Sequence, residues 1–167
     1  MYENEKLELV EKDGLCGVAN KQGELVVPCK YSVVMDFCEG LAPVLKDGLW
    51  GFVNTEGVEV IPCQYKSVKY FKGGYSPVIK ELCGIIDKQG NEIIPCQYEG
   101  VYNFKGDYAL VKQGGLWGVA NKKAEIVIPC NYKDEALDDS YFEDVYQISN
   151  KELMKELLKL SNNIASL

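Results

Sequence analysis

Short apolar runs separated by turn residues repeat along this chain from residue 7 to about residue 142. Residues 41–71 show the pattern in full. One apolar run ends at an Asp-Gly pair, the next ends at an Asn-Thr-Glu-Gly tetrapeptide, and the third ends at Pro62. Brief runs rich in β-branched and aromatic residues, bounded by turn residues, are typical of strands. We therefore expect residues 41–71 to form a three-stranded antiparallel meander followed by a connector.

The same pattern occurs four times at a nearly fixed period. One glycine of the second run recurs at intervals of 34, 33 and 34 residues, at Gly17, Gly51, Gly84 and Gly118. A Pro-Cys-x-Tyr element recurs at the same intervals, beginning at Pro28, Pro62, Pro95 and Pro129. Such a period indicates stacked repeats, in which no single unit can bury its own apolar face. The prediction is an all-β tandem repeat array of short antiparallel β-meanders, with a small β-propeller as the alternative architecture.

The limits of the repeats follow from this alignment. We place a β-repeat domain at residues 1–148, with units at about 7–40, 41–74, 75–107 and 108–142 and a partial fifth unit at 143–148. Apolar columns after the first three Pro-Cys-x-Tyr elements are spaced by three residues, which predicts a bent connector or a single helical turn. The fourth connector contains an acidic insertion at 134–139, which we interpret as a solvated loop.

Two turns in each unit favour residues that tolerate a positive φ. The first turn is Asp-Gly in the first two units, a pair suited to a two-residue hairpin. The third unit has Lys80-Glu81 instead and is one residue shorter, so we expect a distorted hairpin there. The second turn ends in Gly in three units and in Ala124 in the fourth. If the fourth unit keeps this turn, Ala124 must adopt a positive φ.

The repeated glycine of the second run always follows a tryptophan or a cysteine, namely Cys16, Trp50, Cys83 or Trp117. Glycine inside a strand indicates that another backbone or a large ring approaches closely. We expect the Trp or Cys of a neighbouring unit to lie over it. We also expect Trp50 and Trp117 to be buried, structural rings.

Residues 149–167 have a helical period. Ser149 and Glu152 form a capping-box pattern, and apolar residues then recur on one face with Lys and Glu on the other. The last unit of an array needs a cover for its exposed face. We therefore predict a C-terminal amphipathic helix that caps the array. A handle for a partner and the start of a removed domain are the alternatives.

Composition narrows the classes of function. The chain has 167 residues, 47% of them hydrophobic, and 25 acidic against 18 basic residues give a net charge of -7. This charge repels phosphate backbones and anionic lipid, so we expect neither nucleic-acid nor membrane binding. We expect no signal peptide, because no apolar run follows Met1. Seven cysteines, four of them at one repeated position, predict reduced thiols and a cytoplasmic location.

Candidate chemistry is sparse. The aligned cysteines Cys29, Cys63, Cys96 and Cys130 suggest a metal site, but zinc sites use closely spaced pairs, often with His, and the chain has neither. We interpret them as packing residues, with a disulfide between neighbouring units as the less favoured alternative. The missing His removes the commonest general base, and the glycines lie in hairpins rather than in a phosphate-binding loop. We expect no enzymatic activity, no metal and no cofactor.

Eleven tyrosines are the one feature typical of a binding surface. Tyr70, Tyr75, Tyr102 and Tyr108 lie in connectors or at the start of the following strand, in the middle units. Tyrosine suits protein interfaces and ligand clefts because it joins a rigid ring to a polar tip. These four are the candidate contacts for a partner or ligand. The alternative is that their rings pack between units.

The segments Leu49–Gly57 and Leu116–Asn121, each followed by Ile-Pro and Tyr, resemble the bacterial WG-containing repeat family. The resemblance covers residues 7 to about 142 and departs at Cys16 and Cys83, where the family has Trp, and at Ala124. It implies an all-β repeat that serves as a scaffold or binding region, and it carries over no catalytic residue. The function we expect is a non-catalytic protein-interaction or scaffold module in the bacterial cytoplasm. A small-molecule-binding protein that holds its ligand in a groove between repeats is the alternative.

Overall fold

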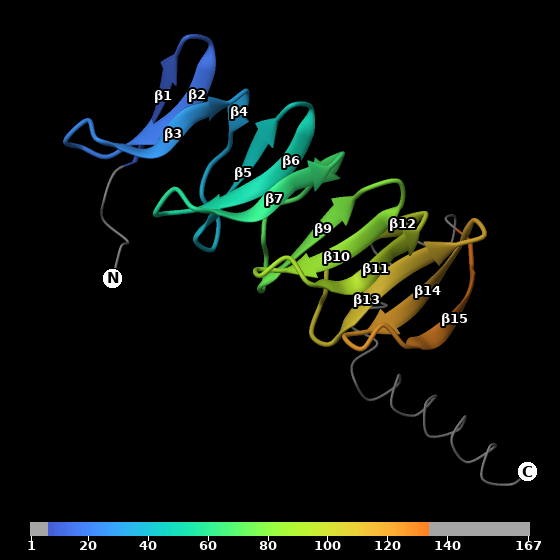
Figure 1. Ribbon diagram of the computed structural model, residues 1–167. Helices are drawn as coiled ribbons and strands as arrows, with labels where there is room; N and C mark the ends of the chain where they lie inside the picture. Colours follow the sequence, from blue (N-terminus) through green and yellow to red (C-terminus); the bar gives the residue numbers. More distant parts are fainter. Residues whose placement is uncertain (1–6, 134–167) are drawn as a thin grey trace, which may run out of the picture.

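The computed structural model describes residues 7–133, and every regular element in this range is a β-strand (Figure 1). The strands form four antiparallel sheets. Sheet 1 contains β1 (Glu8–Lys12), β2 (Leu15–Ala19) and β3 (Leu25–Tyr31). Sheet 2 contains β4 (Val33–Val34), β5 (Leu41–Lys46), β6 (Leu49–Asn54) and β7 (Glu59–Tyr65). Sheet 3 contains β8 (Ser67–Val68), β9 (Tyr75–Ile79), β10 (Cys83–Asp87) and β11 (Glu92–Tyr98). Sheet 4 contains β12 (Gly100–Val101), β13 (Tyr108–Gln113), β14 (Leu116–Asn121) and β15 (Ile126–Tyr132).

The predicted meander of three strands is present in each sheet, and the connector adds a fourth strand that the sequence did not predict. After Tyr31 the chain forms β4, which pairs with β5 of the next unit through Val34 and Val44. β8 and β12 pair with β9 and β13 in the same way. The first three connectors therefore each begin with a short strand, so the helical-turn alternative was wrong for them. Sheets 2 to 4 each contain residues from two sequence repeats.

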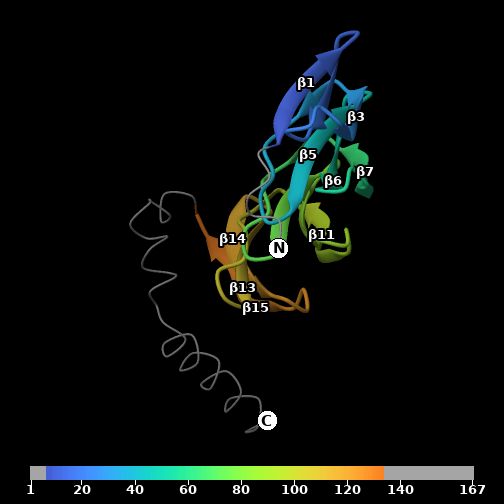
Figure 2. The same ribbon diagram turned by 90° about the vertical axis from the view of Figure 1, so that its left-hand side faces the viewer.

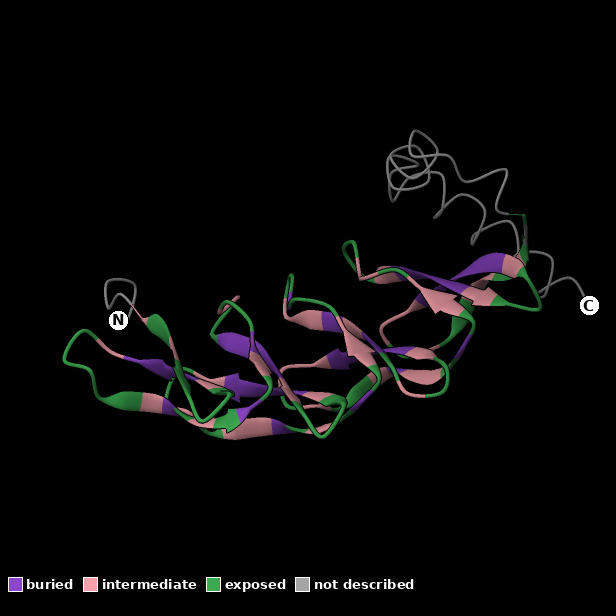
Figure 3. Ribbon diagram, turned by 90° about the horizontal axis from the view of Figure 1, so that it is seen from above, coloured by how far each residue is buried: buried purple, intermediate pink, exposed green. Residues whose placement is uncertain are grey.

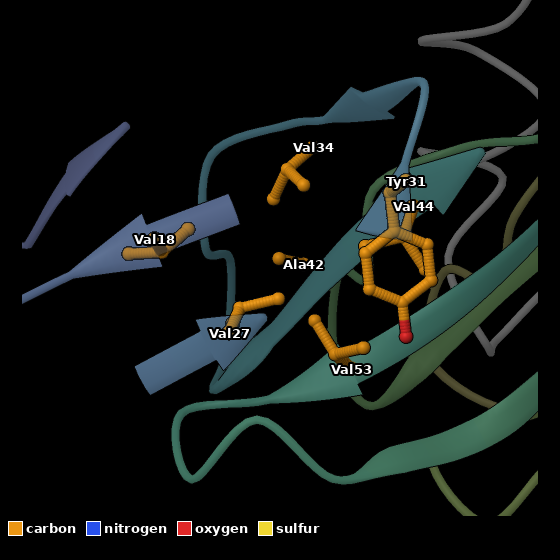
Figure 4. Close-up of a cluster of buried hydrophobic side chains, with 7 residues drawn as sticks. All are labelled: Val18, Val27, Tyr31, Val34, Ala42, Val44 and Val53. Atoms are coloured by element: carbon orange, nitrogen blue, oxygen red, sulfur yellow. The ribbon is translucent and has the colours of Figure 1, made fainter. Parts of the chain in front are cut away.

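The four sheets stack in a row, with the first and the last at opposite ends (Figures 1 and 2). The tandem array is thus confirmed, and the closed β-propeller is not the architecture of residues 7–133. Buried segments lie between successive sheets, whereas the turns are exposed (Figure 3). Figure 4 shows the first of these interfaces, in which Val18, Val27 and Tyr31 of sheet 1 meet four residues of sheet 2. Those four are Val34, Ala42, Val44 and Val53. Each sheet therefore covers the apolar face of its neighbour.

The repeated glycine is required by its own unit, which corrects the expectation of a neighbouring ring. A Cβ at Gly51 would lie 2.5 Å from the carbonyl oxygen of Ile61 and 2.7 Å from the backbone nitrogen of Cys63. The other three glycines meet the equivalent carbonyl at 2.5–2.6 Å. The pairing register shifts between Trp50 and Phe52, so β7 bulges toward β6 where Pro62 leaves no amide for the ladder.

The turns follow the sequence closely. Asp47 and Gly48 have φ values of 52° and 79°, which suit a two-residue hairpin with the twist of the flanking strands. The third unit forms a three-residue loop between Ile79 and Cys83 instead, so its predicted distortion is confirmed. Ala124 has a φ of 60°, as expected from its alignment with glycine. Its methyl group packs against the core between sheets 3 and 4, which offsets part of the backbone strain.

The two tryptophans differ in burial. Trp117 is buried, with 8% of its surface exposed, whereas Trp50 is half-buried against the core between sheets 2 and 3. The expectation of two buried rings was therefore wrong for Trp50.

Three predicted segments lie outside the described residues. They are the acidic insertion at 134–139, the partial unit at 143–148 and the C-terminal helix at 149–167. Within residues 7–133 no helix is long and apolar enough to cross a membrane.

Candidate groove between the connectors

The connectors between sheets line an open groove of about 550 Å³. Its walls come from residues 38–39 of the first connector, 69–72 of the second and 101–103 of the third, together with Pro77 of β9. The second connector forms the centre, because its backbone is bonded to both of the others. Cys38 Sγ lies 3.2 Å from the carbonyl oxygen of Phe71. The side-chain amide of Asn103 donates to the carbonyl oxygens of Lys72 and Tyr75 at 3.1 and 3.0 Å.

Glu39 fixes one end of the groove. Its carboxylate accepts hydrogen bonds from the backbone amides of Gly73 and Gly74 at 2.6 and 2.9 Å. Lys88 Nζ lies 3.2 Å from Glu39 Oε2 and donates to the Glu39 carbonyl oxygen at 2.8 Å. The Gly74 amide, followed by Gly73 and Lys88, lowers the pKa of the Glu39 carboxyl below its usual value. Glu39 therefore acts as an ionised clamp on the turn that follows Phe71.

Phe71 anchors the floor of the groove. Only 1% of its surface is exposed, and its ring meets that of Phe52 edge-on, with the centroids 4.8 Å apart. The backbone amides of Lys69 and Lys72 donate to the carbonyl oxygens of Pro77 and Tyr75 at 3.0 and 2.9 Å. The backbone of residues 69–72 is thus held by β9 on one side and by the core beneath it.

Two of the four predicted tyrosines line this groove. Tyr70 and Tyr102 are 39% and 47% exposed, and the ring of Tyr102 lies 5.2 Å from that of Trp117. Tyr75 is half-buried instead, with its ring centroid 4.8 Å from that of Phe104. Tyr108 is half-buried against the cluster of Leu110, Trp117 and Val119. The structure thus brings Tyr70 and Tyr102 to one surface and packs Tyr75 and Tyr108 into the array.

The unit of a three-stranded meander followed by a connector repeats along the chain, and its sequence matches a known family. Four consecutive segments match the family model described as WG containing repeat, at residues 17–50, 50–81, 84–117 and 117–136. The chain belongs to the WG containing repeat family. Comparisons with curated proteins and with solved structures found no match.

The charges of this WG repeat groove were not predicted from the sequence. Lys69 and Lys72 are exposed on its rim, and their ammonium groups form no ion pair with any residue in 7–133. The remaining charged residue of the lining, Glu39, is already paired with Lys88. The groove is therefore locally positive on a chain whose net charge is -7. No sequence signal pointed to this pair of lysines, because the first connector has a lysine at neither position and the third has one at a single position, Lys105.

The aligned cysteines of the WG repeats are packing residues in the structure. All seven cysteines are free thiols, and each is half-buried. Burial is the largest cause that raises the pKa of Cys63, Cys83 and Cys130, and it raises that of Cys96 to about 11. Such thiols stay protonated near neutral pH and are poor nucleophiles. Residues 7–133 contain no group of three or more metal-ligating side chains of the Cys, Asp or Glu type.

Proposed function

We propose that this WG repeat array is a non-catalytic interaction module that binds another protein through the groove between its connectors. The observation that carries the proposal is the exposure of Tyr70 and Tyr102 on a backbone fixed by Phe71, Glu39 and Asn103. Exposed aromatic rings on a rigid frame lose little conformational entropy on binding, which is why they dominate many interfaces. The rings that pack inside the array supply stability instead.

Three features support a protein partner over an enzymatic role. The groove is open and mostly apolar in its lining, and it runs along three consecutive connectors. The chain contains no His, and burial keeps four of its thiols protonated at neutral pH.

A cytoplasmic location belongs to the same proposal and is supported by the seven free cysteines.

The test compares two double variants in affinity capture from a host lysate. Tyr70→Ala with Tyr102→Ala removes the rings from the groove. Leu25→Ala with Val58→Ala is the matched control, because both residues are exposed, each at 54%, and neither lines the groove. We expect a protein captured by the wild type to be retained by the control and lost with the tyrosine variant, while circular dichroism shows both variants folded. Equal capture by all three would contradict the proposal.

A small-molecule ligand is the second candidate, and the volume of the groove favours it. About 550 Å³ lies within the range of pockets that hold small ligands. Native mass spectrometry of the purified protein distinguishes the two functions. An added mass that is present on the wild type and absent from the tyrosine variant would support the ligand over the protein partner.

A further inference from the structure

Two lysines flank the exposed ring of Tyr70 on the rim of the groove. In Lys69-Tyr70-Phe71-Lys72 the Phe71 ring is buried, while the tyrosine and both lysines are exposed. Backbone hydrogen bonds to β9 hold the two lysines at fixed places, three residues apart on either side of Tyr70. The ammonium groups are thus presented beside an apolar surface without a carboxylate of their own among residues 7–133.

Among the three connectors within residues 7–133, this arrangement occurs at the second alone. The first connector has Met35 and Cys38 at the two lysine positions, and the third has Tyr102 and Lys105. In the first connector, Asp36 takes the place of Tyr70. Within the described residues, a partner that needs both positive charges and the ring therefore has a single site, at the second connector.

Resting on the proposed function, we infer that this site takes an extended acidic segment of the partner, in which an aromatic or large apolar side chain is flanked by carboxylates. The apolar side chain lies against Tyr70 and Tyr102, and the carboxylates pair with Lys69 and Lys72. Charge complementarity identifies a short anionic segment, because the rest of this acidic chain repels a long polyanion that extends beyond the two lysines. A nucleic-acid strand is therefore disfavoured.

A random peptide display library selected on the purified full chain tests the inference. Selections run in parallel on the wild type, on Tyr70→Ala with Tyr102→Ala, on Lys69→Gln with Lys72→Gln, and on Lys12→Gln with Lys123→Gln. The last variant is the matched control, because it loses the same two charges at exposed lysines outside the groove. We expect the wild type and the control to enrich Asp and Glu beside an aromatic residue, and the groove variant to lose that acidic preference.

Fluorescence anisotropy then measures the selected peptide in about 50 mM and about 300 mM salt. We expect the groove lysine variant to weaken binding roughly tenfold at low salt, and salt to weaken binding by the wild type more than by that variant. Enriched peptides without acidic residues that still require Tyr70 and Tyr102 would overturn the inference and leave the proposed function standing. The absence of any tyrosine-dependent enrichment would count against both. Tighter binding of a labelled single-stranded oligonucleotide that depends on Lys69 and Lys72 would also overturn the acidic-peptide inference.

Discussion

Lys88 and Glu39 lie 49 positions apart in the sequence and form an ion pair, with Nζ 3.2 Å from Oε2. The same ammonium group donates to the Glu39 carbonyl oxygen at 2.8 Å. Glu39 belongs to the connector that enters sheet 2, and Lys88 belongs to a turn of sheet 3. The Glu39 carboxylate also accepts hydrogen bonds from the backbone amides of Gly73 and Gly74 in the next connector. One side chain therefore ties three segments of the array together beside the groove.

Replacement of Glu39 by Gln should destabilise the array by roughly 1 kcal/mol, because charge-assisted hydrogen bonds at an exposed position contribute about this much. The measurement is the free energy of urea unfolding at neutral pH. Glu56→Gln is the control, since that exposed carboxylate has no bonded partner among residues 7–133. The pKa of Glu39 is lowered in the folded state, so its contribution is present above the usual pKa near 4.5 and is lost as the pH falls through the folded pKa. A difference between wild type and Glu39→Gln that grows on acidification would contradict the assignment.

Alanine at Gly57 should cost much more stability than alanine at Gly23. Both glycines end the same kind of turn, with φ values of 77° and 78°, so both substitutions carry backbone strain of roughly 1 kcal/mol. A Cβ at Gly57 would also collide with the carbonyl oxygen of Val26 in sheet 1, whereas a Cβ at Gly23 meets nothing within 4 Å. We expect an additional cost of about 1–3 kcal/mol for Gly57→Ala in urea unfolding. Equal effects of the two substitutions would mean that the sheets do not approach at this turn.

Truncation of Trp117 should destabilise the protein more than truncation of Trp50. Trp117 is buried in the cluster with Leu110 and Val119, and replacing a buried aromatic ring by alanine costs about 3–5 kcal/mol. Trp50 is half-buried, so its replacement by alanine leaves a smaller unfilled volume. Urea midpoints and thermal unfolding of the two variants provide the measurement. A larger loss of stability for Trp50→Ala than for Trp117→Ala would contradict the prediction.

Rising pH between about 9 and 11 should destabilise the array in part through its buried thiols. The pKa of Cys96 is raised from its usual value of 9.0 to about 11, so the folded state holds this proton more tightly than the unfolded state. The resulting stability is fully present below about pH 9 and is lost as the pH rises toward 11. Cys63, Cys83 and Cys130 act in the same direction. Unfolding in reducing buffer should show a shallower decline over this window for Cys96→Ala than for the wild type. Parallel curves would show that the thiol does not contribute.

The sequence alone determined the three meander strands of each unit, the turns between them and the period of the array. These features depend on interactions within a few residues, such as the positive φ of Asp47 and Gly48 in a two-residue hairpin. The same reasoning predicted the positive φ of Ala124, because its turn is closed by the neighbouring side chain of Asn121. Four copies of one pattern strengthen each local inference, since a departure in one copy stands out against the others.

Only the tertiary structure decided how the units join and which side chains meet at the groove. The bulge at Pro62 brings β7 over Gly51, which a regular register would not do. Tyr70 and Tyr75 lie five positions apart in the sequence, yet one ring lines the groove and the other meets Phe104. Glu39 and Lys88 meet because stacking places a connector beside a turn from another sheet. Such contacts depend on the register and stacking of whole sheets, which residues many positions apart set together, so no local pattern contains them.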